Sequence, residues 1–373
     1  MSHAVLVDRQ ELPNARIATR DLPPLPDGTV RLKVESFAVT SNNVTYAVAG
    51  DRFGYWNFFP ADNEEGTQWG IVPMWGHAMV EDSAHLDFET GERVYGYLPM
   101  ATHLTIVPDD VSPRGFTDGA PHRQPMSPIY NQYTRLSHDA EHDPDKEAER
   151  MIFGPLFKTG FLIESMFRRE NWFGAEAVVL TSASSKTAMG LASVAKDRSP
   201  DIARVGLTSR GNVGFVESTG LYTRVLAYDD IGQLEHRPSV SVDFAGNADL
   251  LRQVHDHYGD TLRYSCLVGV THVQAQSEGE SDGDRHADGG GTKSMPGPEP
   301  LLFFAPDHAV AAVKEMGAKA FSEDVAASWH RFLNDVDGTV RVATRDGIEA
   351  ARDAYLALLS GKVDPAEGIV IRP

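Results

Sequence analysis

The sequence predicts an α/β chain that joins a β-barrel to a doubly wound parallel sheet, and three observations support this fold class. Before residue 110, short strands alternate apolar and polar residues and are separated by Gly and Pro. From residue 175 onward, apolar strands alternate with helices, as in βαβ units. The length of 373 residues fits two domains of roughly 150 residues or more.

The first half is expected to be a barrel or a sandwich of short strands. The segment 29–39 alternates valine and leucine with polar residues, and the same pattern continues at 71–81, 92–100 and 103–108. The stretch 111–148 is polar and rich in Pro, Asp and His, so we interpret it as a connection.

The period of the apolar residues changes near residue 150. The segment 147–170 has a helical composition, and its Phe, Leu and Ile residues are too dense for a surface helix. We therefore expect a buried helix that Gly154 and Pro155 either kink or delay.

Beyond residue 175 the pattern indicates a parallel sheet covered by helices on both faces. The turn and helix at 186–197 follow the first of these strands, and later helices are expected near 247–258, 307–317 and 322–334. Strands are expected at 175–180, 203–209, 224–231, 239–247, 263–272, 300–306, 339–344 and 367–373. The acidic, glycine-rich segment 274–299 cannot bury enough apolar surface to order itself, so we expect a flexible loop there.

Charge and cysteine content exclude several classes of protein. Asp and Glu number 53 against 34 Lys and Arg, which gives a net charge of −19. This balance argues against nucleic acid and against anionic membrane surfaces as partners. The single cysteine, Cys266, excludes a disulfide framework and a zinc site with several thiolates. The histidines lack the spacing of a zinc site, so no metal site is predicted. The sequence shows no bilayer-spanning apolar run and no signal-peptide pattern at its start, so a cytoplasmic protein is expected.

The most informative motif is VVLTSASSKTAMGLA at 178–192, which has the layout strand, small-residue turn, helix. In a dinucleotide-binding fold, glycines in this turn let the backbone approach a pyrophosphate at the helix N-terminus. Here Ser182, Ser185 and Ala188 stand at the glycine positions, and all three are small. The residues predicted to bind the phosphates are Ser182, Ala183, Ser184, Ser185, Lys186 and Thr187, through hydroxyl groups and one positive charge. The alternative is a serine-capped helix start in a fold that has lost its nucleotide.

Three further strand ends supply candidate cofactor contacts. Ser209 and Arg210 end the second strand, where an NAD site carries Asp or Glu, so a 2′-phosphate and NADPH are favoured. The alternative is an arginine in a solvent-facing loop. The fourth and fifth strands end at Gly246-Asn247 and at Val270-Thr271-His272, and ligands in such sheets bind at carboxyl ends.

Two side chains are candidate catalytic residues. Tyr46 follows the polar run 40–43 on a predicted short helix, and its phenol could donate a hydrogen bond to a carbonyl. The alternative is a packed aromatic ring. His272 could donate a proton, although a single histidine in a strand-end loop is more often structural.

Together these segments resemble the medium-chain dehydrogenase/reductase superfamily, nearest its zinc-independent quinone oxidoreductase-like branch. The resemblance runs through 29–50, 90–111, 175–196 and 348–373. The motifs TSNNVTYAV, LTSASSKTA and VDFAGN are similar, more narrowly, to a subgroup termed domain of unknown function 2855.

The resemblance implies a GroES-like β-barrel domain from residues 1–145 and 336–373, and a Rossmann domain from 146–335. It also implies NADP as the cofactor, a small-molecule substrate and a homodimer. By position, Tyr46 matches a tyrosine near the cofactor, and Thr159 lies roughly where a threonine faces the nicotinamide. The cysteines of zinc-dependent members are missing, so a zinc-independent reaction is expected.

The first functional hypothesis is an NADPH-dependent oxidoreductase that reduces a small enone, quinone or other activated carbonyl. Without zinc, charge developing on the substrate oxygen would need hydrogen-bond donors such as Tyr46 and His272. The alternative is a non-catalytic protein of the same fold that acts as a nucleotide sensor or a partner-binding module, which the glycine-free turn motivates.

Overall fold

The computed structural model describes residues 1–63, 66–268, 295–361 and 364–373. Its contacts divide the chain into two compact units. Unit 1 contains Met1–Ile152 and Val340–Pro373, and unit 2 contains Phe153–Thr339. The boundaries thus fall at residues 152 and 339, where the sequence suggested 145 and 335.

Unit 1 is built on antiparallel sheets. In the described part of the chain, a three-stranded sheet has the order β2-β1-β4, and a larger sheet has the order β17-β18-β3-β5-β6-β10-β9-β8, with β7 also paired to β3. Only the terminal pair β17–β18 is parallel among these described pairings. The strands are β1 (Ser2–Asp8), β2 (Ala15–Arg20), β3 (Val30–Val39), β4 (Trp69–Gly70), β5 (Pro73–Ser83), β6 (Arg93–Pro99), β7 (His103–Ile106), β8 (Pro108–Ser112), β9 (Gly115–Asp118), β10 (Gln132–Arg135), β17 (Arg341–Asp346) and β18 (Glu367–Arg372).

Strands β9 and β10 lie inside the stretch 111–148 that the sequence suggested was a connection, and β8 ends within it. Their side chains are mostly polar because the strands form the end of the larger sheet and are partly exposed. A buried pair, Phe116 on β9 and Tyr133 on β10, stacks with ring centroids 5.3 Å apart. This single aromatic contact is too sparse a signal to reveal three short strands in the sequence.

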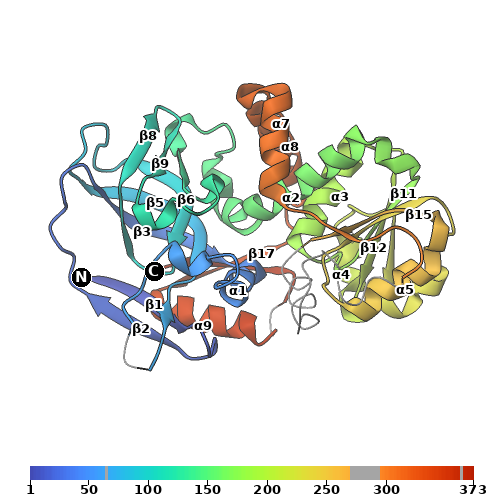
Figure 1. Ribbon diagram of the computed structural model, residues 1–373, viewed down its shortest axis with the longest axis horizontal. Helices are drawn as coiled ribbons and strands as arrows, with labels where there is room; N and C mark the ends of the chain where they lie inside the picture. Colours follow the sequence, from blue (N-terminus) through green and yellow to red (C-terminus); the bar gives the residue numbers. More distant parts are fainter. Residues whose placement is uncertain (64–65, 269–294, 362–363) are drawn as a thin grey trace, which may run out of the picture. The chain divides into compact units, whose positions relative to one another are not determined.

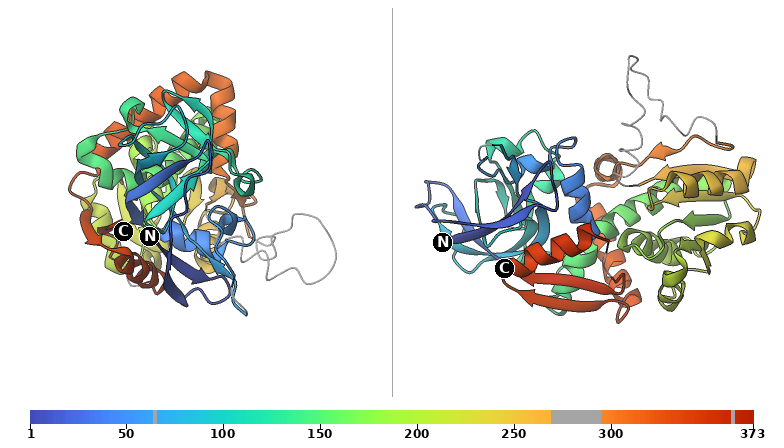
Figure 2. Two further views of the ribbon diagram at one scale, coloured as in Figure 1. Left: turned by 90° about the vertical axis from the view of Figure 1, so that its left-hand side faces the viewer. Right: turned by 90° about the horizontal axis from the view of Figure 1, so that it is seen from below.

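Where the structure describes unit 1, two α-helices cover parts of its sheets. Helix α1 (Ser41–Val48) follows β3, and helix α9 (Ile348–Leu359) packs on β1, β2, β17 and β18 (Figure 2). Helix α9 buries Ile348, Ala351, Ala354 and Tyr355, spaced three or four residues apart, so one face of the helix completes the core. The end of the chain therefore returns to the barrel.

Helix α2 (Glu147–Arg169) is continuous although Pro155 lies inside it. A proline within a helix removes one backbone hydrogen bond and usually bends or ends the helix. Buried aromatic residues on both sides of Pro155, including Phe153 and Phe157, offset this loss by burying apolar area. The expected buried helix is therefore present, and it starts before the proline.

Unit 2 contains a parallel sheet with the order β13-β12-β11-β14-β15-β16 in the described residues. This is the Rossmann order 3-2-1-4-5-6, in which the strand order reverses beside the first strand. The strands are β11 (Ala177–Leu180), β12 (Ala203–Thr208), β13 (Arg224–Ala227), β14 (Ser239–Asp243), β15 (Leu262–Leu267) and β16 (Leu301–Leu302).

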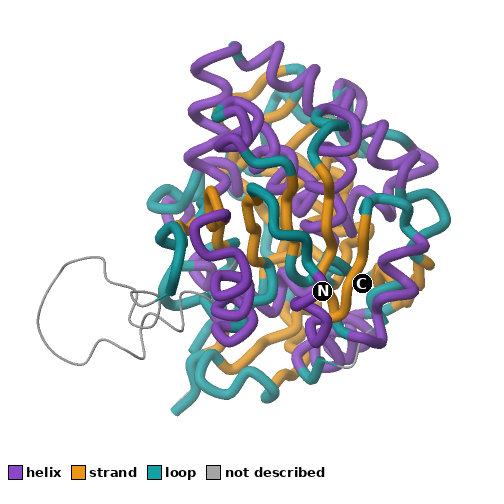
Figure 3. Tube along the Cα trace, turned by 90° about the vertical axis from the view of Figure 1, so that its right-hand side faces the viewer, coloured by secondary structure: helices purple, strands orange, loops and turns teal. Residues whose placement is uncertain are grey.

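Helices lie on both faces of this sheet (Figures 1 and 3). On one face, Val179 and Leu207 pack with Leu250 and Val254 of α5. On the other, α2 and α3 approach so closely that a Cβ added at Gly160 would lie 2.4 Å from the backbone N of Leu191. The other α-helices in the described residues of unit 2 are α3 (Lys186–Arg198), α4 (Val213–Ser218), α5 (Ala248–Tyr258), α7 (Ala305–Met316) and α8 (Ala318–Asp335).

In the described ranges, every helix is too short or too polar to cross a membrane. The segment 274–299 was expected to be a flexible loop, and its residues 274–294 lie outside the described residues. The fold class predicted from the sequence, a barrel joined to a doubly wound parallel sheet, is confirmed.

Candidate functional site

The turn between β11 and α3 keeps a shape that usually needs glycine. Ser182 has φ = 48°, in the left-handed region that side chains with a Cβ rarely adopt. Such a conformation costs roughly 1 kcal/mol or more in a residue other than glycine. A serine therefore stands where the chain must bend sharply from the strand toward the helix.

The neighbouring residue Ala183 anchors the turn to the second strand. Its N–H donates to the Leu207 carbonyl at 3.0 Å, and its own carbonyl accepts from the Tyr222 hydroxyl at 2.7 Å. Gly206 makes this approach possible, because a Cβ there would lie 2.9 Å from both Ala183 Cβ and the Tyr222 ring. The small side chains near this turn are thus required for its close packing on β12.

Tyr228, which the sequence analysis missed, lies beside the strained serine. It is the first residue after β13. Burial raises the pKa of its phenol, while hydrogen bonds from the backbone and the side chain of Ser182 act against that rise. No spacing in the sequence indicates this proximity, because Tyr228 follows β13, which is separated from β11 by β12 in the sheet.

The first turn of α3 is partly open to solvent. Ser185 caps the helix, and its Oγ accepts from the N–H of Ala188 at 3.3 Å. Ser184 accepts from the Asn212 amide at 3.3 Å, and Lys186 and Thr187, in the first turn, are half-buried. N–H groups in the first turn of a helix have no partner within the helix, and they attract anions.

The predicted 2′-phosphate contact, Arg210, lies in an acidic environment. Its Nη2 is 3.2 Å from a carboxylate oxygen of Asp230 and 3.5 Å from one of Asp229. Ser209 immediately precedes it as the cap of a short 3₁₀ turn. Because the Arg210 side chain is 65% exposed, its two ion pairs are weak, and an incoming phosphate can compete with them.

At the end of β14, polar groups join this strand to the turn. Thr181 Oγ1 donates to the buried carboxylate of Asp243, and Thr181 Oγ1 also accepts from the Phe244 N–H at 3.0 Å. Gly246 has φ = 65°, and Asn247 caps α5 by accepting from the N–H of Asp249 and of Leu250, each at 3.0 Å. The Asn247 side chain thus has a structural partner already.

The structure brings the candidates at Ser182–Thr187, Ser209–Arg210 and Gly246–Asn247 to the carboxyl ends of β11, β12 and β14. Thr159 lies on α2 in the same unit, where its hydroxyl donates to the Pro155 carbonyl at 3.4 Å. Val270, Thr271 and His272 lie outside the described residues.

The candidate catalytic residue Tyr46 lies in unit 1 on α1 and is 4% exposed. Its phenol oxygen accepts from the Asn42 amide at 2.6 Å and from the Trp75 indole N–H at 3.1 Å. Burial raises the pKa of this phenol far above its usual value. Tyr46 is therefore a neutral phenol whose oxygen is occupied by two donors, which leaves its own O–H to donate.

A larger aromatic cluster surrounds Tyr46. Its ring lies 4.6 Å from that of Tyr55 and 5.5 Å from that of Tyr97, measured between centroids. The expectation of a packed aromatic ring and the expectation of a hydrogen-bond donor are thus compatible in this residue. In the part of the chain that the structure describes, no group of three or more His, Cys, Asp or Glu side chains is arranged to hold a metal ion.

Comparison with solved structures defines the class of fold. The chain matches CurA from Vibrio vulnificus in complex with NADPH with a TM-score of 0.59 and 13% identity, covering 99% of this chain and 98% of that one. It matches the quinone oxidoreductase from Coxiella burnetii with a TM-score of 0.56 and 11% identity, covering 100% and 99%. It matches the CurK enoyl reductase with a TM-score of 0.56 and 12% identity, covering 100% and 99%.

The fold is thus that of medium-chain dehydrogenase/reductase proteins, with a GroES-like barrel and a Rossmann sheet, and the predicted resemblance is confirmed. Comparison with curated protein sequences gives no match. The chain belongs to the family described as Protein of unknown function (DUF2855), whose model matches residues 37–364.

Proposed function

We propose that this protein is an NADPH-dependent, zinc-independent oxidoreductase that reduces a small enone, quinone or other activated carbonyl. The observation that carries the proposal is the turn between β11 and α3. Ser182 keeps a left-handed backbone without glycine, and Lys186 places a cation in the first turn of α3. The similarity in fold to the CurA–NADPH complex and to a quinone oxidoreductase supports the same cofactor and reaction class.

The residues of the turn fit a diphosphate. Ser184, Ser185, Lys186 and Thr187 are half-buried, so part of each side chain remains accessible. Their hydroxyl groups and the Lys186 ammonium would bind phosphate oxygens, aided by the N–H groups at the start of α3. Arg210 would bind the 2′-phosphate after leaving its two carboxylate partners.

Bound NADPH would supply a hydride to the substrate. The role of this chain in that step is to stabilise negative charge on the substrate oxygen. Tyr46 suits this role because Asn42 and Trp75 both donate to its oxygen, which directs its O–H toward another acceptor. A hydrogen bond to a developing oxyanion lowers the activation free energy of the reaction by about 3 kcal/mol.

The test has two stages, binding and turnover. NADPH binding is followed by its fluorescence, and turnover is followed as loss of NADPH absorbance with 1,4-naphthoquinone or an enone as the substrate. The Tyr46→Phe variant is expected to bind NADPH normally and to lose about 100-fold in kcat, because it removes one oxyanion donor. Tyr130→Phe, which alters another phenol of the same cluster, is the matched control.

Each result has a distinct meaning. Absence of NADPH binding at millimolar concentration would defeat the proposal. Binding without turnover across quinones and enones would favour a nucleotide sensor, the alternative that the glycine-free turn suggested. Equal loss of kcat in both tyrosine variants would show that the ring cluster matters only as packing.

A further inference from the structure

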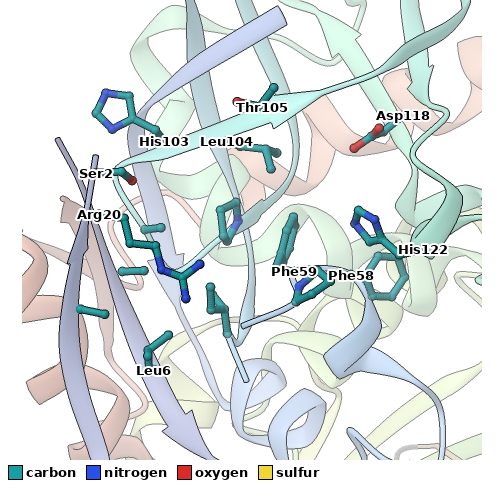
Figure 4. Close-up of a pocket in the computed structure, with 16 residues that line it drawn as sticks. Ser2, Leu6, Arg20, Phe58, Phe59, His103, Leu104, Thr105, Asp118 and His122 are labelled. Carbon is teal, nitrogen blue, oxygen red and sulfur yellow. The ribbon is translucent and has the colours of Figure 1, made fainter. Parts of the chain in front are cut away.

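Unit 1 contains a pocket that the proposed reaction does not use. It has a volume of about 240 Å³ and is bounded by the β1–β2 hairpin, by β7 and by the residues around Phe58 (Figure 4). All of its lining residues belong to unit 1, and Tyr46 is not among them. Its walls differ in character, with small side chains on the hairpin and aromatic rings opposite.

Small residues on the hairpin create the hollow. In the antiparallel register of β1 and β2, Ala4 faces Ala18, and both line the pocket with Ala101, which bridges to Ala4. Side chains two residues apart on a strand share a face, so Ala18 and Arg20 point to the same side of β2. Larger side chains at these alanine positions would fill the pocket. Protein interiors are normally packed without voids of this size, so the small residues are what keeps the pocket open.

The opposite wall is rigid and apolar. Phe58 and Phe59 are buried, and the guanidinium of buried Arg123 lies 5.3 and 5.2 Å from their ring centroids. Arg123 is fixed in turn by Asp118 at 2.8 Å, and burial of this ion pair is stabilised by further hydrogen bonds. The Asp118 carboxylate at the pocket edge is therefore neutralised by Arg123.

The charge at the mouth of the pocket comes from Arg20. Figure 4 shows Arg20 reaching from β2 toward Phe59. Its partner is Asp62 at 2.9 Å, and the two side chains are 47% and 88% exposed, so the pair is weak and exchangeable. His103, also in the lining, has its Nε2 3.4 Å from Glu81, and burial lowers its pKa below the usual value. A cation thus stands over an apolar hollow in a chain of net charge −19.

We infer that this pocket binds a small amphipathic carboxylate, such as a medium-chain or aromatic acid. The apolar body lies against Phe58 and Phe59, and the carboxylate replaces Asp62 on Arg20. An arginine fork matches a carboxylate with two parallel hydrogen bonds, which a neutral alcohol cannot form. At about 30 Å³ for each water-sized group, the volume holds about eight carbon-sized groups.

Calorimetry with octanoate and with 1-octanol tests the inference in the absence of any cofactor, so its outcome is independent of the proposed reductase activity. Octanoate is expected to bind the full-length protein with one site, about tenfold more tightly than 1-octanol. Arg20→Gln is expected to remove that difference. Arg16→Gln, on the same face of β2 but outside the lining, is the matched control and is expected to leave it unchanged.

A second variant tests the cavity itself. Ala18→Leu fills the hollow while Arg20 stays in place, so it is expected to weaken both octanoate and 1-octanol about tenfold or more. Thermal unfolding of each variant reports whether it is folded. Absence of saturable octanoate binding at millimolar concentration would overturn the inference. So would equal binding of acid and alcohol, or octanoate binding that both Arg20→Gln and Ala18→Leu leave intact.

Discussion

A buried histidine in unit 1 gives the protein a calculable sensitivity to acid. His77 lies on β5, directly across from Tyr95 on β6, and is fully buried. Within the described residues, neither of its ring nitrogens has a hydrogen-bond partner. Burial lowers the pKa of His77 to about 3, although the nearby Glu147 carboxylate opposes that shift.

The sign of the effect follows from proton counting. Between pH 3 and 6.5 the unfolded chain holds a proton on His77 that the folded chain lacks, so stability falls as pH falls through this range. The pKa of His77 is lower in the folded chain than in the unfolded chain by about 3.5. At about 1.4 kcal/mol per pH unit, the free energy of unfolding falls by about 5 kcal/mol once the pH is below both values. At pH 4.5 the loss is about 3 kcal/mol, a large part of the stability of a typical domain.

Urea unfolding at pH 7.5 and at pH 4.5 measures this loss. The wild-type chain is expected to lose about 3 kcal/mol more than His77→Leu between the two pH values, because the variant has no group to protonate at that position. His330→Leu, which removes an exposed histidine, is expected to behave as the wild type. Equal acid losses in wild type and His77→Leu, or a His77 pKa near 6.5 by NMR, would refute the reasoning.

Two further predictions concern unit 2. Changing both Asp229 and Asp230 to Asn removes the two ion pairs of Arg210. In fluorescence titrations, the affinity for NADPH is then expected to rise a few-fold, while the affinity for NADH stays within about twofold. An equal change for both cofactors would show that Arg210 does not contact a 2′-phosphate. Gly160→Ala places a Cβ 2.4 Å from the backbone nitrogen of Leu191. The free energy of unfolding, measured in urea, is therefore expected to fall by about 2 kcal/mol. An unchanged urea midpoint would contradict the close packing of α2 on α3.

The architecture could be predicted because it rests on long, repeated patterns. Apolar strands alternating with helices after residue 175 predicted the parallel sheet, and the spacing of Ser182, Ser185 and Ala188 marked the turn at the start of α3. The homodimer and the choice of NADPH stay predictions, because nothing in the described residues tests them.

What the sequence did not reveal are contacts between residues far apart in the chain. Tyr228, just after β13, lies beside Ser182, and Trp75 on β5 donates a hydrogen bond to Tyr46. Neither pair has a recognisable spacing in the sequence. Strands β8 to β10 were missed for a related reason, since partly exposed polar strands lack an apolar alternation. The spacing of apolar residues predicts which face of a helix or strand is buried, but it does not predict which residues from other helices or strands contact that face.

Calorimetric titration of NADPH into the wild-type protein and into Lys186→Gln tests the central claim most directly, with Lys196→Gln at the other end of α3 as the control. If the glycine-free turn binds the diphosphate, Lys186→Gln is expected to weaken NADPH about tenfold and Lys196→Gln to leave it unchanged. Equal affinity in all three proteins would contradict a diphosphate at the start of α3.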